Sequence, residues 1–286
     1  ERKLFLKEGM EATYGVLYEY AKYNNSTSEK RLNPATGVLE SVAFQSDFKA
    51  HKYGAFVQAN RRLMQERLTV SAGMRIDGST AASGLVNPLK QWSPRVSASF
   101  AFAPGWTFNA NAGMYSQLPA YTILGYAVGD ARVNATDSTS YLNNRQLVAG
   151  LKWDGSEKNF VVSVEGFFKG YQNSPISSLQ GVALANLGAD FGVVGNEAVT
   201  FDGLGRSYGA ELLLQQRLYK GFYGLLAYTF VRSEFEDSSG EFVPSSWDNR
   251  HILSMTGGKK FENGWEIGTR LLFSGGLPYT PADAGS

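Results

Sequence analysis

The sequence predicts an all-β fold, an antiparallel up-and-down transmembrane β-barrel to which this chain contributes about 11 strands. Three observations predict this fold class. Apolar and polar residues alternate along most of the chain, which gives each strand one apolar and one polar face. Short and long connections alternate between the strands. The strands are also about ten to thirteen residues long, more than is usual in soluble sheets and enough for a tilted bilayer crossing.

The strands follow from the alternation, taken in order along the chain. Residues 3–7 look like the tail of one strand. In the next, Met10, Tyr14 and Tyr18 alternate with polar residues. The complete strands are expected at residues 10–20, 49–60, 68–77, 93–102, 106–115, 145–153, 159–171, 206–218, 222–232, 250–260 and 265–273.

The connections between these strands form two unequal sets. The short ones are expected at residues 61–66, 104–105, 154–158, 219–221 and 262–264. The long ones are expected as polar or glycine-rich loops at residues 23–47, 78–92, 116–143, 172–204 and 233–248. Short turns on one side and long loops on the other are typical of outer-membrane barrels.

Aromatic residues gather at both ends of the expected strands. Trp106, Trp153 and Trp265 lie beside short turns, and Tyr18 and Tyr115 lie toward the long loops. Such bands are typical of the two interfaces of a membrane, where aromatic rings form girdles.

Composition excludes several classes of function. The formal net charge is +1 and the basic residues are scattered, so nucleic acid is not an expected partner. The chain has no Cys, which rules out disulfides and thiolate metal sites, and no acidic and His residues have metal-ligand spacing. We therefore expect no metal and no cofactor. No window approaches the roughly 20 apolar residues of a transmembrane helix.

The polar faces of the strands supply one set of candidate site residues. In a barrel they face the lumen, and in a soluble sandwich they face water; strand length, loop asymmetry and the aromatic bands favour the barrel. The expected lumen-facing residues are Arg75, Asp77, Arg95, Asn109, Asn111, Glu165, Glu211 and Arg270.

The long loops supply the second set, because binding residues concentrate on loops held by a rigid scaffold. Aromatic rings there offer faces to sugars, haem or siderophore rings, and arginines offer charge to anionic ligands. The candidate ligand-binding residues are Tyr121, Tyr126, Arg132, Tyr141, Arg145, Trp247 and Arg250.

One catalytic motif occurs, and its context argues against catalysis. Residues Gly205–Gly209 match G-x-S-x-G, but a nucleophile elbow needs a strand before the serine and a helix after it. Here the motif opens an alternating strand. His51 and His251 are expected to be interfacial or loop-packing residues. We predict no catalytic residue, and a protein that is not an enzyme.

Several pieces of the chain, taken in order, resemble the barrel of a TonB-dependent outer-membrane receptor. These pieces are LTVSAGMRIDG (68–78), SPRVSASFAF (93–102), NANAGMYSQLP (109–119), GRSYGAELLLQQRL (205–218), WDNRHILSM (247–255) and GGLPYTP (275–281). The family's barrel has 22 strands, a plug domain inside it and a TonB box. An open sheet with a lipid-facing side would leave two unpaired edges, which a membrane does not tolerate. We therefore expect residues 1–286 to be a partial barrel, without the plug, the early strands and the final strands. The first residues have no apolar signal-peptide core, which agrees with an internal fragment or a removed leader.

The resemblance implies a receptor in the bacterial outer membrane that takes up a scarce nutrient with energy from TonB. The ligand would be a ferric siderophore, haem, cobalamin, a peptide or an oligosaccharide, held by the external loops and the plug. Implied partners are membrane lipid, the TonB complex through the plug, and the nutrient, with a surface lipoprotein as a further candidate. Two alternatives remain open from the residues: a passive porin-like channel, and a soluble extracellular β-protein that binds carbohydrate.

Overall fold

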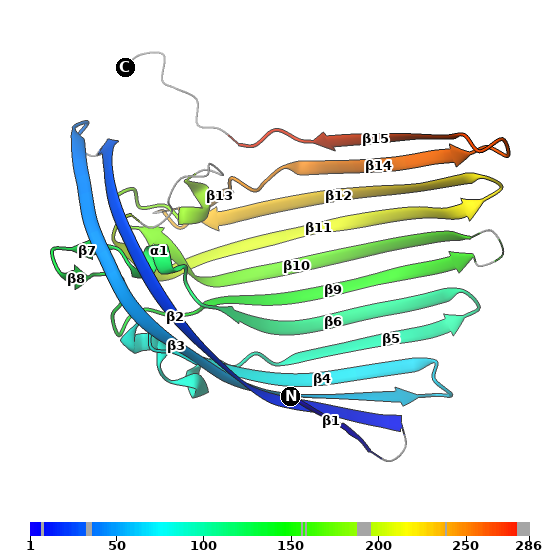
Figure 1. The fold of residues 1–286 in the computed structure, drawn as a ribbon, viewed down its shortest axis with the longest axis horizontal. Helices are drawn as coiled ribbons and strands as arrows, with labels where there is room; N and C mark the ends of the chain where they lie inside the picture. Colours follow the sequence, from blue (N-terminus) through cyan, green and yellow to red (C-terminus); the bar gives the residue numbers. More distant parts are fainter. Residues whose placement is uncertain are drawn as a thin grey trace.

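The computed structural model describes residues 1–6, 9–32, 36–155, 157, 159–187, 196–237 and 239–278. Almost all of its regular structure belongs to one antiparallel sheet (Figure 1). The sheet begins with the short strand β1 (Arg2–Phe5). Its long strands are β2 (Met10–Leu32), β3 (Leu39–Leu63), β4 (Leu68–Ser79), β5 (Arg95–Ala103), β6 (Trp106–Gln117), β9 (Leu142–Gly155), β10 (Phe160–Ser177), β11 (Val199–Tyr219), β12 (Phe222–Glu236), β14 (Arg250–Lys260) and β15 (Glu266–Ser274).

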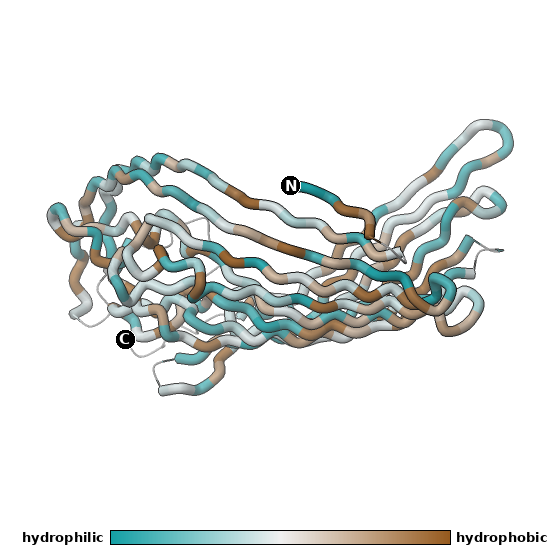
Figure 2. The backbone as a smooth tube through the Cα atoms, turned by 90° about the horizontal axis from the view of Figure 1, so that it is seen from below, coloured by the Kyte–Doolittle hydropathy of each residue, from teal (hydrophilic) through white to brown (hydrophobic). Residues whose placement is uncertain are grey.

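The strands pair in the order in which they follow in the chain. The order is β1-β2-β3-β4-β5-β6-β9-β10-β11-β12-β14-β15, and β13 (Phe242–Pro244) pairs with β12. The up-and-down meander predicted from sequence is confirmed: the 11 expected strands correspond to the long strands from β2 to β15, and the expected tail is β1. In the described residues β1 and β15 do not pair, so the sheet is an open, curved wall (Figure 2).

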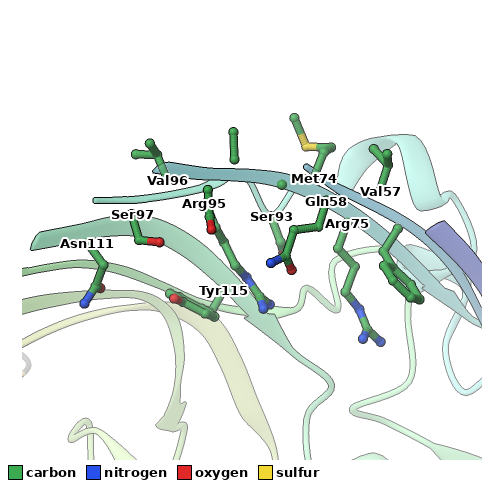
Figure 3. Close-up of a pocket in the computed structure, with 14 residues that line it drawn as sticks. Val57, Gln58, Met74, Arg75, Ser93, Arg95, Val96, Ser97, Asn111 and Tyr115 are labelled. Atoms are coloured by element: carbon green, nitrogen blue, oxygen red, sulfur yellow. The ribbon is translucent and has the colours of Figure 1, made fainter. Parts of the chain in front are cut away.

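The two faces of this wall differ as the alternation predicts. Val57, Met74 and Val96 project from one side of the strands, and Arg75 and Arg95 project from the other (Figure 3). The polar side is the concave side of the curved sheet. The convex side carries large apolar side chains that are mostly exposed, among them Val16, Leu147, Phe168 and Leu271. A continuous face of exposed apolar side chains marks a surface that contacts something other than water.

Aromatic rings line the short-turn end of the convex face. The ring centroids of Phe102 and Trp106 are 6.2 Å apart, those of Trp106 and Trp153 are 6.4 Å apart, and those of Trp153 and Phe160 are 6.4 Å apart. Tyr115 was expected to belong to the aromatic band near the long loops. Its ring is instead on the concave face, 4.3 Å from the Arg95 guanidinium, so it does not belong to a band on the convex face. Tyr115 shares the phase of Asn111 in β6, so alternation turns it inward.

The predicted loop at residues 23–47 is also wrong. Strands β2 and β3 remain paired as far as Leu32 opposite Leu39, forming one long hairpin that extends past the other strands (Figure 1). Val42, Phe44, Ser46, Phe48 and Ala50 form its buried face. The Asn, Ser and Thr residues of β2 look like a loop in isolation, but their backbone groups bond to β3. For the same reason β10 and β11 extend into the predicted loop at 172–204, of which residues 188–195 lie outside the described residues.

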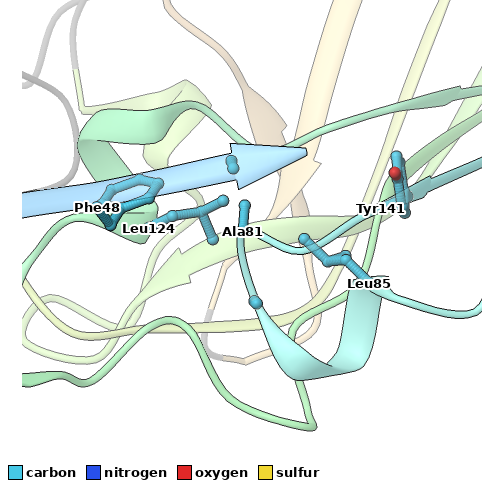
Figure 4. Close-up of a cluster of buried hydrophobic side chains, with 7 residues drawn as sticks. Phe48, Ala81, Leu85, Leu124 and Tyr141 are labelled. Atoms are coloured by element: carbon cyan, nitrogen blue, oxygen red, sulfur yellow. The ribbon is translucent and has the colours of Figure 1, made fainter. Parts of the chain in front are cut away.

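The main apolar cluster lies among the long connections. It comprises Phe48, Ala50, Ala81, Ala82, Leu85, Leu124 and Tyr141, and we call it the loop cluster (Figure 4). It joins the long hairpin to η2 (Ser83–Leu85), α1 (Tyr121–Leu124) and the residue before β9. A second, short sheet of β7 (Ala127–Val128) and β8 (Ala131–Arg132) follows α1. The described part of the chain has no helix long and apolar enough to cross a membrane. The last three residues of the GGLPYTP motif lie outside the described residues.

Candidate functional site

The concave face is hollowed where strands β2 to β6 meet the long connections. One hollow of about 780 Å³ and a second of about 400 Å³ adjoin, since both are lined by Arg75, Ser93 and Arg95. We call the two together the concave groove. Its remaining walls come from strands β2 to β6, residues 118–121 and Tyr141.

Two ion pairs hold most of the charge of this groove. Lys52 Nζ lies 2.7 Å from Glu19 Oε1, across the β2–β3 pairing. Arg75 donates two hydrogen bonds to the carboxylate of Asp77, each 2.7 Å long. Bidentate arginine–carboxylate bonds fix both side chains in one orientation. In the described residues no carboxylate pairs with Arg95, which stacks on Tyr115. The groove therefore presents one guanidinium with unused donors beside two neutralised pairs.

Two tyrosines close the groove toward the loops. Tyr141 is only 4% exposed, and burial raises the pKa of its phenol, with the Asp77 carboxylate adding to the effect. Burial also raises the pKa of Tyr121, whose buried hydroxyl has no hydrogen-bond partner in the described part of the chain. A buried unpaired hydroxyl costs free energy unless a partner arrives. Both phenols stay un-ionised at neutral pH.

The loop cluster and the neighbouring Phe44 position three of the sequence-predicted residues. The ring of Tyr121 meets Phe48 edge-on at 5.6 Å. The Arg132 guanidinium lies 4.2 Å from the same Phe48 ring, and its Nη1 donates to the Ala81 carbonyl at 3.1 Å. Burial lowers the pKa of Arg132. Tyr126 packs edge-on against Phe44 at 5.2 Å. The described contacts of Tyr126 and Arg132 pack them mainly against strand β3 of the long hairpin, outside the lining of the concave groove.

A neighbouring hollow of about 550 Å³ holds Trp247. Its lining is mostly apolar, and the rings of Tyr171 and Phe235 stack there with centroids 5.5 Å apart. Arg250 lies just beyond, with Nε 3.6 Å from Oδ2 of the buried Asp248. This hollow shares Tyr115, Ser116 and Gln117 with the concave groove, so aromatic and charged surfaces adjoin.

The remaining predicted residues divide between the two faces. Asn109, Asn111 and Glu165 line a further concave hollow of about 200 Å³, nearer the short turns. Glu211 lies directly opposite Glu165 in the β10–β11 pairing, and Arg270 lies opposite Thr256 on the same face. The pairing puts these side chains on the concave face; that this face lines a lumen stays a prediction. Arg145, by contrast, lies within β9, exposed and on the convex face beside Leu147, away from the other candidates.

The prediction omitted Glu19, Lys52 and Tyr115 from the site. All three alternate with the apolar residues of their strands, so period-two alternation was a sufficient signal for the direction of their side chains. Their contacts could not be predicted from the sequence, because the Glu19–Lys52 pair depends on the register between β2 and β3, and the Tyr115–Arg95 stack on that between β5 and β6.

The remaining motif and the two histidines have structural partners. Ser207 of the G-x-S-x-G motif lies inside β11, with its Oγ 3.2 Å from Ser233 Oγ. The Nδ1 atoms of His51 and His251 lie 2.7 Å and 2.8 Å from the hydroxyls of Tyr18 and Tyr228. Over the described ranges no three His, Asp or Glu side chains group to hold a metal ion.

An open wall of antiparallel strands, with one apolar convex face and one polar concave face, is the architecture of a membrane β-barrel wall. Comparison with protein-family models matches residues 4–286 to "TonB dependent receptor-like, beta-barrel". The chain therefore belongs to the TonB-dependent receptor β-barrel family. Comparison with curated protein sequences finds no match.

Solved structures share this fold. The ferric-catecholate import receptor Fiu from Escherichia coli K12 superposes with a TM-score of 0.69 and 12% identity, over 99% of this chain and 44% of Fiu. The copper transporter OprC gives 0.64 and 15%, over 93% of this chain and 40% of OprC. The FrpB iron transporter from Neisseria meningitidis gives 0.62 and 13%, over 94% and 40%. The chain thus spans less than half the length of each receptor, and at these identities the likeness concerns the fold alone.

Proposed function

We propose that this chain forms part of the wall and external loops of an outer-membrane receptor that takes up a scarce nutrient with energy from TonB. The observation that carries the proposal is the concave groove at the loop end of the wall, where Arg95, Tyr121 and Tyr141 converge. The family to which the chain belongs supports the same class of protein, because its model describes the barrel of TonB-dependent receptors.

The groove favours a ligand with both charge and aromatic or apolar surface. The Arg95 guanidinium has unused donors for an anionic group, and Tyr121 has an unpaired hydroxyl. Beside them, the hollow around Trp247 offers aromatic rings. Ferric siderophores and haem combine these features; cobalamin, peptides and oligosaccharides are the other classes to compare. The ligand-binding roles of Tyr126, Arg132, Arg145 and Arg250 stay predictions.

The proposed partners follow from the two faces. Membrane lipid contacts the apolar convex face, and the concave face receives a plug domain through which TonB acts. A surface lipoprotein covering the loops remains a candidate partner. The proposed location is the bacterial outer membrane.

Ligand binding by the complete protein tests the proposal. Purified receptor is titrated with ferric siderophores, haem, cobalamin, peptides and oligosaccharides, and uptake of the ligand that binds is measured in cells with and without functional TonB. Arg95→Gln is expected to weaken binding of an anionic ligand by about tenfold or more, because a charge-assisted hydrogen bond is lost. Arg62→Gln is the matched control, since Arg62 is exposed at the short-turn end.

Three outcomes would count against the proposal. Uptake that is independent of TonB, together with steady ion conductance in planar bilayers, would favour the passive channel. Binding unchanged by Arg95→Gln would remove the concave groove from the site. A complete protein that stays monodisperse without detergent would remove the membrane location.

A further inference from the structure

We propose that the convex face binds the phosphate of an anionic lipid between Arg145 and Arg206, at the loop-side edge of the apolar band. This inference rests on the proposed membrane location. It assigns a specific lipid site to residues outside the concave groove.

The strand pairing brings the two arginines together. Gly170 of β10 lies opposite Arg145 of β9 on one side and opposite Arg206 of β11 on the other. Neighbouring strands are about 4.8 Å apart, so the two arginine Cα atoms are about 10 Å apart on one face of the sheet. Gly170 has no side chain, and a Cβ built there would meet only a Phe168 ring atom at 3.7 Å. The space between the arginines is therefore open, at a width that a phosphate group bridges.

The charges around this gap are predominantly positive. In the described residues Arg145 has no carboxylate partner, and its side chain is exposed. Arg206 Nε lies 2.7 Å from Glu234 Oε2, but Glu234 is shared, because Arg232 Nη2 lies 2.9 Å from its other oxygen. Asp248 is likewise shared between Arg232 and Arg250. Three guanidiniums, those of Arg206, Arg232 and Arg250, thus share two buried carboxylates, and the exposed Arg145 lies across the gap from Arg206, so the net charge around the gap is positive.

The residues one step toward the short turns explain why the anion belongs to a lipid. Leu147, Phe168 and Tyr208 form the next row, directly paired across β9, β10 and β11. Leu147 and Phe168 are 56% and 51% exposed. The following row is small (Ala149, Gly166 and Ala210), and a Cβ on Gly166 would meet nothing nearer than 3.9 Å. A phosphate held by the arginines would place an attached acyl chain over these rows, where burial of apolar area stabilises it.

Native mass spectrometry of the complete protein tests the inference. The protein is released from mixed micelles containing equal amounts of phosphatidylglycerol and phosphatidylcholine, and the retained lipids are counted. Wild type is expected to retain phosphatidylglycerol preferentially. The double variant Arg145→Gln/Arg206→Gln is expected to lose this preference by about tenfold or more. Arg95→Gln, on the opposite face, is expected to retain it.

Two controls distinguish a lipid site from a loss of folding or from binding of phosphate alone: the single variant Arg145→Gln and competition with inorganic phosphate. Because Arg206→Gln leaves Glu234 with one partner fewer, Arg145→Gln alone is also measured; it breaks no ion pair and should reduce the preference part of the way. Equal retention of both lipids by wild type, or full retention by the Arg145→Gln variant, would overturn the site. Displacement of the lipid by millimolar inorganic phosphate would also overturn it, since the apolar rows would then contribute nothing. Failure of the protein to enter micelles or bilayers at all would instead refute the proposed membrane location.

Discussion

Replacing Leu85 by alanine is expected to open the loop cluster while leaving the strand wall intact. Leu85 is fully buried, at 0% exposure, and packs with residues of the long hairpin and α1. The cluster is small and lies between the long connections and the buried face of the long hairpin. A cavity there acts on the loops that form the concave groove, because these loops have few other apolar contacts.

The magnitude follows from the burial of the side chain. Leucine-to-alanine changes at fully buried sites cost about 2–5 kcal/mol, which includes the cavity left behind. Expressed as a local opening equilibrium, this is an increase of about 30-fold to several thousandfold. Leu89→Ala is the matched control: Leu89 lies four residues away in the same connection but is 62% exposed.

Hydrogen exchange of the complete protein measures this effect at individual amides. The amide of Gly84 donates to the Thr136 carbonyl at 3.0 Å, and the amide of Gly125 donates to the Tyr121 carbonyl at 2.8 Å. In Leu85→Ala both amides should exchange faster by the stated factor, with strand amides in β9 and β10 unchanged. Equal exchange in Leu85→Ala and Leu89→Ala would refute the loop cluster as the element that orders the groove.

Three further perturbations probe other parts of the molecule. Burial raises the pKa of the Tyr141 phenol, so the un-ionised phenol stabilises the fold fully below the ordinary tyrosine pKa of about 10, and this stabilisation is lost as pH rises above it. Tyr141→Phe should therefore make the melting temperature depend less on pH between about pH 9 and 11.5. Gly209→Ala should reduce the folded fraction in a heat-modifiable gel-shift assay, because the new Cβ meets a backbone carbonyl, whereas Gly166→Ala has room and should not. Glu211→Gln removes like charges opposite Glu165, and should raise the free energy of unfolding in denaturant titrations by about 0.2–1 kcal/mol; a decrease would show that a cationic group neutralises the pair.

The fold was largely predictable because its signals are local. Alternation along β6 and β9 fixes which side chains share a face, and the short turns fix which strands are neighbours. The long hairpin was missed for the converse reason. Residues 24–30 are polar, and only pairing with residues 41–47 of the partner strand makes them a strand. In that partner strand the side chains of Val42 and Phe44 are buried.

The candidate site was predicted less completely than the fold. Tyr121 and Tyr141 were named as loop residues, and the structure brings them into one hollow with Arg75 and Arg95; Arg145, also named as a loop residue, lies on the convex face. The face to which a strand residue points depends on its phase in the strand. The predicted strand begins at residue 145, whereas β9 begins at Leu142, so Arg145 was treated as a loop residue although it lies within the strand. Strand boundaries are least certain at the ends of strands, which is where the candidate ligand-binding residues of the loops begin.

The sequence by itself determined the strand phase, the order of pairing and the chemical difference between the two faces, because each depends on residues close together in the chain. Only the tertiary structure decided which distant side chains meet. The Glu19–Lys52 pair, the Arg95–Tyr115 stack and the gap between Arg145 and Arg206 each depend on the register between strands. Register is set jointly by turn geometry and by packing among the long connections. The tertiary structure therefore determined where the concave groove and the loop cluster lie, on a sheet whose apolar and polar faces the sequence already predicted.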